Sequence, residues 1–204
     1  MTDDEAASIR HIVEATVAEA RAHLPGLVEE LYVLVHQTTT VMAETGAGGY
    51  ALGPHVVRID FDPALDMVAV ARRSVRHTLL HELHHAARLA VRPQEVALVS
   101  WPATAVFEGL ASVFESTVGG IDVPWRAYDE DVIEAWATEL FAQPVDEHAH
   151  WWRFAHPDGR TAIVYRVGSW IVDRAAARSA RTAADLVGVS AEEVLELAGL
   201  DTWP

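Results

Sequence analysis

The segment His81-Glu82-Leu83-His84-His85 carries the pattern on which the interpretation of this sequence depends. Histidines four residues apart leave the same face of a helix, with their rings about 6 Å apart along its axis. Two imidazoles placed in this way can bind one zinc ion, and the glutamate between them can accept a proton from a water molecule at the metal. The bare pattern also arises by chance, so the rest of the chain has to support it.

The surrounding sequence predicts a helix of the right kind. It should run from about Ala71 to Val91 and stop before Pro93, which cannot continue a helix. Apolar residues recur along it at helical spacing and should form one buried stripe: Val75, Leu79, Leu83, Ala86 and Ala90. A different side carries His77, His81, His85 and Arg88. The motif therefore lies on a helix that has a separate face to bury.

The neighbouring histidines offer an alternative ligand pair. His77 lies four residues before His81, but His77 and His85 are about 12 Å apart along the helix, so one ion cannot bind all three. A His77–His81 pair would leave Glu82 outside the motif, and we reject it. His84 points about 100° away from His85 and is expected to be a surface or packing histidine.

A catalytic zinc site needs a third protein ligand and an open position for water. The sequence contains no cysteine, so this ligand has to be His, Asp or Glu. Glu108 follows the motif helix on a second expected helix, from Pro102 to about Val118, and Gly109 would let two helices approach closely. The alternative is that Glu108 is an ordinary solvated glutamate.

The two motifs in this order, His-Glu-Leu-His-His at 81–85 and Glu-Gly-Leu-Ala at 108–111, resemble the predicted zinc-dependent proteases of the DUF2268 group. These proteins belong with the gluzincins, whose third zinc ligand is a glutamate on a helix after the motif helix. The resemblance covers roughly Gly49 to Leu195 and includes a late Tyr-x-x-Gly segment, Tyr165–Gly168. It implies an α+β fold, one zinc ion bound by His81, His85 and Glu108, and hydrolysis of peptide bonds.

One position departs from the gluzincin pattern. Gluzincins often carry an acid one turn after the third ligand, where it supports a ligating histidine, but this position is Ser112 here. Glu115 lies two turns after Glu108 on the same face and could take over the supporting role. It could equally be a surface acid, and both interpretations stay open at this stage.

The mechanism that follows from the motif assigns Glu82 as general base, accepting a proton from a zinc-bound water and returning it to the leaving amine. Zinc peptidases also need a donor that stabilises the oxyanion, and Tyr165 and His156 are the two candidates. Tyr165 is favoured by the Tyr-x-x-Gly segment. Its alternative is a core tyrosine with the hydroxyl at the surface.

A second metal site is suggested by Asp146-Glu147-His148-Ala149-His150-Trp151-Trp152. Its histidines are two residues apart, so a helix would direct them to different sides. An exposed turn with flanking aromatic residues is the better interpretation.

The chain before the motif should form a helix and a small sheet. A capping box, Thr2 with Glu5, begins a helix from Asp3 to His23. Leu31–His36 is a β-rich run, and Gly46–Gly53 is expected to be a flexible loop that could form a mobile rim over the site.

A half-exposed strand is predicted at His55–Phe61, with Val57, Ile59 and Phe61 inward and Arg58 and Asp60 outward. We place it near a sheet edge, where it could bind a substrate backbone by strand addition. The alternation is equally explained by an ordinary sheet strand.

Length and composition favour one α+β domain over residues 1–204, a mostly helical zincin-like fold with a small sheet before the motif helix. Its parts would be a helix and strands at 1–62, the ligand helices at 71–118 and a helical region at 128–204. Further helices are expected near Asp129–Phe141, Asp146–Ala155 and Thr161–Arg178, and after a second capping box at Ser190 and Glu193.

The net charge of −15, from 30 acidic and 15 basic residues, argues against binding of nucleic acid or an anionic membrane. The acidic start of the chain lacks an apolar signal core, and no apolar run reaches the length of a membrane span, so a cytoplasmic location is expected. The expected partner is a peptide or protein substrate; the oligomeric state is not indicated.

Three functions are compatible with these residues. The first is a zinc metallopeptidase with Glu82 as base. The second is a non-catalytic, gluzincin-like binding or regulatory module, which the intact Glu82 disfavours. The third is a zinc hydrolase of a non-peptide amide, which the same metal centre could serve.

Overall fold

The computed structural model describes residues 2–41, 45–96 and 100–200. The chain forms two compact units, residues 1–93 and 94–204, and the boundary falls between the motif helix and the helix that carries Glu108. The elements are mostly helices with one small sheet, which confirms the α+β, mostly helical class. The single domain expected over 1–204 stays a prediction, and each unit is described by itself.

The first unit begins with helix α1 (Asp3–His23), whose limits agree with the prediction. Its capping box is present: the Glu5 backbone N–H donates to Thr2 Oγ1 over 3.3 Å, and the Thr2 N–H donates to Glu5 Oε2 over 2.6 Å. These bonds satisfy donors that a helix start leaves free. An ion pair of 2.7 Å between Glu19 and Arg76 joins α1 to the motif helix.

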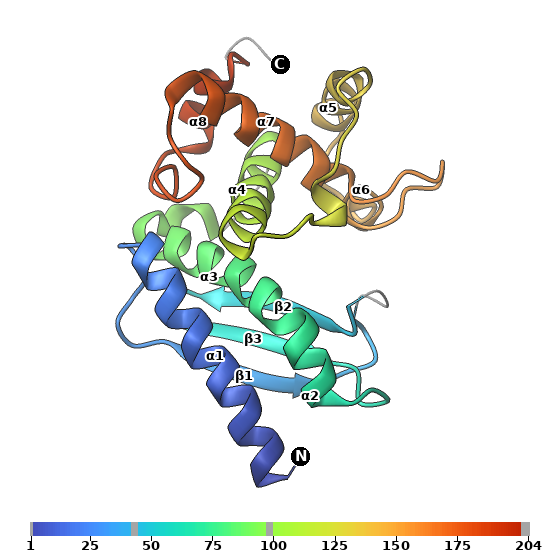
Figure 1. The fold of residues 1–204 in the computed structure, drawn as a ribbon. Coiled ribbons are helices and arrows are strands. Elements are labelled where there is room, and N and C mark those ends of the chain that lie inside the picture. The colour runs from blue at the N-terminus through green and yellow to red at the C-terminus, as the bar shows by residue number, and fades with distance from the viewer. Residues whose placement is uncertain (1, 42–44, 97–99, 201–204) are drawn as a thin grey trace. The chain divides into compact units, whose positions relative to one another are not determined.

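The sheet has three strands, β1 (Tyr32–Gln37), β2 (Ala47–Gly53) and β3 (Val56–Phe61), in the order β1-β3-β2. β1 runs parallel to β3, and β2 runs antiparallel to it (Figure 1). Two predictions are therefore wrong. The Gly46–Gly53 segment is mainly a strand, and β3, expected near an edge, is the central strand.

The central position of β3 explains why one of its outward residues is buried. Val57, Ile59 and Phe61 are buried as predicted, but Asp60 is only 2% exposed. Its carboxylate lies 2.9 Å from Arg58 Nε and 3.0 Å from Nδ1 of His36 on β1. A buried carboxylate needs such partners, and the neighbouring strand supplies one of them.

The motif helix is longer than expected at its start. It runs through α2 (Met67–Val70), a π-helical turn (Ala71–Val75) and α3 (Arg76–Val91), and it ends at Val91 as predicted. The Asp66 carboxylate caps it by accepting from the N–H groups of Val68 and Ala69. In this unit α3 packs against α1, β2 and β3 (Figure 1).

The motif helix does not have one buried stripe and one exposed polar side. Every residue from 79 to 89 is buried, including the histidines of the motif and Arg88. Ala90, expected in the apolar stripe, is instead only partly buried. The polar face is therefore part of the interior, which is the environment of a site rather than of a solvated helix face.

The second unit is helical. Its elements are α4 (Trp101–Gly119), α5 (Ile133–Phe141), α6 (Ala149–Arg153), α7 (Ile163–Ser179) and α8 (Ala191–Ala198). Each of the predicted helices is present with shifted ends. Gly120 ends α4 in the left-handed conformation, and Ser190 accepts from the Glu193 N–H at the start of α8.

Helices α4 and α7 touch through their backbones at two glycines. A Cβ on Gly109 would lie 2.2 Å from the carbonyl carbon of Gly168, and a Cβ on Gly168 would lie 2.0 Å from the Ala105 oxygen. Only residues without a side chain permit this approach. The contact gives a structural reason for the glycine of the Tyr-x-x-Gly segment.

Within residues 2–41, 45–96 and 100–200, no helix combines the length and the apolar character that a membrane crossing needs.

Candidate metal centre

The two motif histidines face one another on consecutive turns of α3. Their Nε2 atoms are 3.1 Å apart, and the rings are nearly perpendicular, at 83°, with centroids 4.7 Å apart. Two nitrogens that each lie about 2.0–2.1 Å from one tetrahedral zinc ion are about 3.3 Å from each other. The pair His81 and His85 therefore fits the demands of a single ion.

Glu82 lies on the part of α3 that faces strand β2. Its side chain is 7% exposed. An ideal Cβ on Gly49 of β2 would lie 2.6 Å from Glu82 Cγ, which shows that the strand backbone and the carboxylate side chain are in direct contact. Strand β2 therefore lies next to the motif glutamate, whereas the strand proposed from the sequence for substrate binding was β3.

The third predicted ligand, Glu108, is buried on α4, with 6% of its surface exposed. The alternative of a solvated glutamate is therefore wrong. Its Oε1 lies 3.2 Å from Nη1 of Arg153 on α6. Arg153 was not identified from the sequence, because its segment was interpreted through its histidines and because an ion pair across 45 positions leaves no local signal.

His81, His85 and Glu108 form a group that could hold a metal ion. Each offers one ligand atom, these atoms all lie within 4.8 Å of one another, and all three residues are buried. Two imidazoles and a carboxylate are a usual ligand set for catalytic zinc. The residues fit the metal that the family resemblance implies.

Ser112 and Glu115, which lie one and two turns after the third predicted ligand on the same helix, are both buried. Glu115 is 1% exposed, so it is not a surface acid, and Ser112 is fully buried. Support of the metal centre by Glu115 stays a prediction. His84 is fully buried as well, so it is a packing histidine and not a surface histidine. Burial lowers the pKa of His77, and the adjacent Arg76 guanidinium lowers it further.

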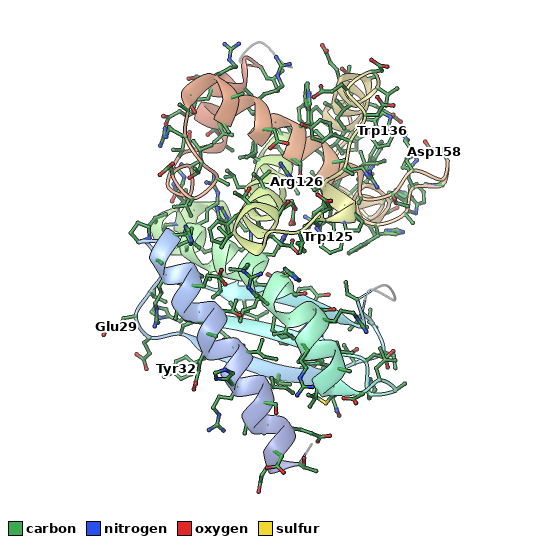
Figure 2. The ribbon with its side chains drawn as sticks, viewed as in Figure 1. Glu29, Tyr32, Trp125, Arg126, Trp136 and Asp158 are labelled. Carbon is green, nitrogen blue, oxygen red and sulfur yellow. The ribbon has the colours of Figure 1, made fainter. Side chains whose placement is uncertain are left out.

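The two candidate oxyanion donors lie in the second unit. Tyr165 is partly buried on α7, one turn before Gly168. The Nδ1 atom of His156 lies 2.9 Å from Asp158 Oδ1, and its ring centroid is 4.6 Å from that of Trp152. Asp158 belongs to the loop after α6 (Figure 2). A catalytic role for either residue stays a prediction.

The histidines near α6 interact with an aromatic side chain. The ring centroids of His148 and His150 lie 4.2 Å and 5.6 Å from that of Trp151, and His148 Nδ1 is 3.5 Å from an Asp146 oxygen. Residues 146–148 form a bend and turn at the surface that leads to His148 at the N-cap of α6, which agrees with the predicted exposed turn with flanking aromatic residues.

The fold and the site therefore define a chain with a buried His/His/Glu group of the kind that binds a divalent metal ion. A family model described as a predicted Zn-dependent protease, DUF2268, matches residues 9–196 of the 204, and the chain belongs to this family. The resemblance inferred from the two motifs is confirmed. No curated protein and no solved structure matches the chain.

Proposed function

We propose that the protein is a zinc metallopeptidase of the gluzincin type, in which one zinc ion is held by His81, His85 and Glu108. The observation that carries this proposal is the buried group of three ligand atoms within 4.8 Å of one another, with a glutamate directly after the first histidine. Membership of a predicted zinc-dependent protease family supports it.

A zinc ion held by His81, His85 and Glu108 would lower the pKa of a bound water molecule to about 7. Glu82 accepts the proton of this water as general base and returns it to the leaving amine. Its burial keeps competing solvent away from the carboxylate. Tyr165 and His156 are the candidates for the hydrogen bond to the developing oxyanion.

The substrate would be a peptide in extended conformation. β2 is an outer strand of the sheet, and among the described residues no strand pairs with its other side. Because this strand contacts Glu82, a peptide added to its open edge would pass beside the general base. Strand β2, and not β3, would therefore bind the substrate backbone by strand addition.

The test is a metal analysis combined with a broad hydrolysis assay. Protein purified without chelator should contain one zinc per chain and cleave members of an internally quenched peptide library. A chelator should abolish cleavage, and added zinc should restore it. Absence of bound metal, or cleavage that a chelator does not affect, would contradict the proposal; a zinc-loaded protein inert toward all peptides would favour a non-catalytic module or another amide substrate.

Arg153 should contribute to zinc affinity through its contact with Glu108. Groups that hold a ligating side chain in place typically change metal affinity 10- to 100-fold when they are removed, so Arg153→Ala should weaken zinc binding by about that factor. The measurement is a competition titration with a chromophoric chelator. Arg178→Ala is the control, because that arginine donates to the Leu197 carbonyl instead. Equal zinc affinity in the two variants would show that the ion pair does not support the site.

A further inference from the structure

Gly49 occupies a position where no side chain fits. An ideal Cβ would lie 2.6 Å from Glu82 Cγ, 2.8 Å from Thr78 Cγ2 and 3.0 Å from Glu82 Oε1. The Thr78 methyl is attached to a branched Cβ that has few rotamers, and Glu82 Cγ is not the free end of its side chain. Neither neighbour can move away cheaply, so even a methyl group at Gly49 must displace the glutamate or the strand.

The backbone groups of Gly49 point toward the open edge of the sheet. The Asp62 N–H donates to the Gly46 carbonyl over 3.2 Å, so these residues form a hydrogen-bonded pair. Such pairs recur at every second residue of an antiparallel ladder, which directs the N–H and C=O groups of Gly48 toward β3 and those of Gly49 away from it.

The pairing of β3 with β1 agrees with this alternation. Tyr32 N–H donates to the His55 carbonyl, and Thr38 N–H donates to the Phe61 carbonyl. The odd-numbered residues of β3 therefore face β1, which leaves the even-numbered ones, such as Asp60, to face β2.

The face of β2 that meets the motif helix is built from small residues. Ala47, Gly49 and Ala51 pair with the buried β3 residues Phe61, Ile59 and Val57, and thus lie on the same side of the sheet as these side chains. The large side chain of Tyr50 is on the opposite side. The helix can therefore approach the strand backbone, and at Gly49 it leaves no room for a Cβ beside Glu82.

We propose that Gly49 is a positioning residue that sets the Glu82 carboxylate against the substrate-binding edge of β2. The missing side chain lets the carboxylate lie beside the N–H and C=O groups that an added peptide would use. The scissile bond is then held next to the base by the same residue that fixes the position of the base. This inference rests on the proposed peptidase function and adds a determinant that the zinc motif does not contain.

The experiment compares Gly49→Ala with Gly48→Ala. A Cβ on Gly48 would have its nearest neighbours at 4.0 Å, so this variant makes the same change in the same strand without the clash. On a peptide from the quenched library, Gly49→Ala should lower kcat about 100-fold, because a displacement of about 1 Å in a catalytic group has an effect of that size. KM and zinc content should stay at the wild-type values, and Gly48→Ala should match the wild type throughout.

A second arm asks whether the effect passes through Glu82. In a Glu82→Gln background, Gly49→Ala should cause no further loss of the residual activity. A 100-fold loss in that background, a rise in KM at unchanged kcat, or equal activity of the two glycine variants would each overturn the inference.

A third arm does not depend on turnover. In the Co²⁺-substituted protein, Gly49→Ala should change the visible absorption spectrum, since it displaces the side chain of Glu82, the residue next to the proposed ligand His81, and Gly48→Ala should leave it unchanged. This spectrum decides the inference if the wild type binds metal but cleaves no peptide, an outcome that counts against the peptidase function alone. Identical spectra for the two variants would overturn the inference, and a wild type that binds no metal would overturn both.

Discussion

Glu82→Gln is expected to keep one zinc per chain and to hydrolyse peptides about 10²- to 10⁴-fold more slowly than the wild type. This is the range that general acid–base catalysis contributes. The amide has nearly the shape of the carboxylate and should fit the same buried space between α3 and β2. It cannot accept a proton from water, so kcat should fall while the positions of His81 and His85 are preserved.

The measurement is kcat and KM on a peptide that the wild type cleaves, together with metal analysis of each preparation. Glu14→Gln is the matched control, because Glu14 is an exposed residue of α1 and the same change of charge there should have no effect. If the Glu82 variant is fully active with zinc bound, the proposed role of this glutamate is wrong. If it loses zinc as well, the change acts through the metal site and not through proton transfer.

The candidate metal centre was the part of this protein most accessible from sequence, because the spacing of its two histidines is a local feature. The four-residue spacing of His81 and His85 fixes their relative position on any helix, and the structure places their Nε2 atoms 3.1 Å apart. The expectation for Glu108 needed only a second helix with a glycine beside the glutamate. Its burial agrees with that expectation.

The sheet was harder to predict because its glycines have a non-local cause. Glycine is rare in strands and common in loops, so the run from Gly46 to Gly53 favoured a loop. Strand β2 needs a glycine at position 49, because α3 leaves no room for a side chain there. The alternation of β3 likewise predicted which side chains point inward, but it contained nothing about how many strands lie on either side.

Contacts between distant segments were outside the reach of the sequence for a similar reason. The pairing of Arg153 with Glu108 and the burial of Asp60 between His36 and Arg58 depend on which elements become neighbours. Periodicity describes one element at a time. It identifies the face of a helix or strand but not the charged group that the fold brings to it.

Gly168→Ala is expected to destabilise the second unit by about 3 kcal/mol or more, the upper range for overpacking a tight interior. The new Cβ would lie 2.0 Å from the Ala105 oxygen and 2.9 Å from the Gly109 Cα, and both are backbone atoms. Helices α4 and α7 would have to separate. In a helix interior without such a contact, the same change would stabilise by about 1 kcal/mol, so the sign of the effect is diagnostic.

Tryptophan fluorescence during urea unfolding provides the measurement, since all seven tryptophans lie at or after Trp101 and report on the second unit. Gly109→Ala should be destabilising as well. The double variant should lose less than the sum of the two single losses, because one separation of the helices relieves both clashes. A gain in stability for Gly168→Ala would contradict the close crossing of α4 and α7.

The same variant should also weaken zinc binding. Since Glu108 precedes Gly109, a separation of α4 from α7 should displace the Glu108 carboxylate, and zinc affinity should fall together with stability.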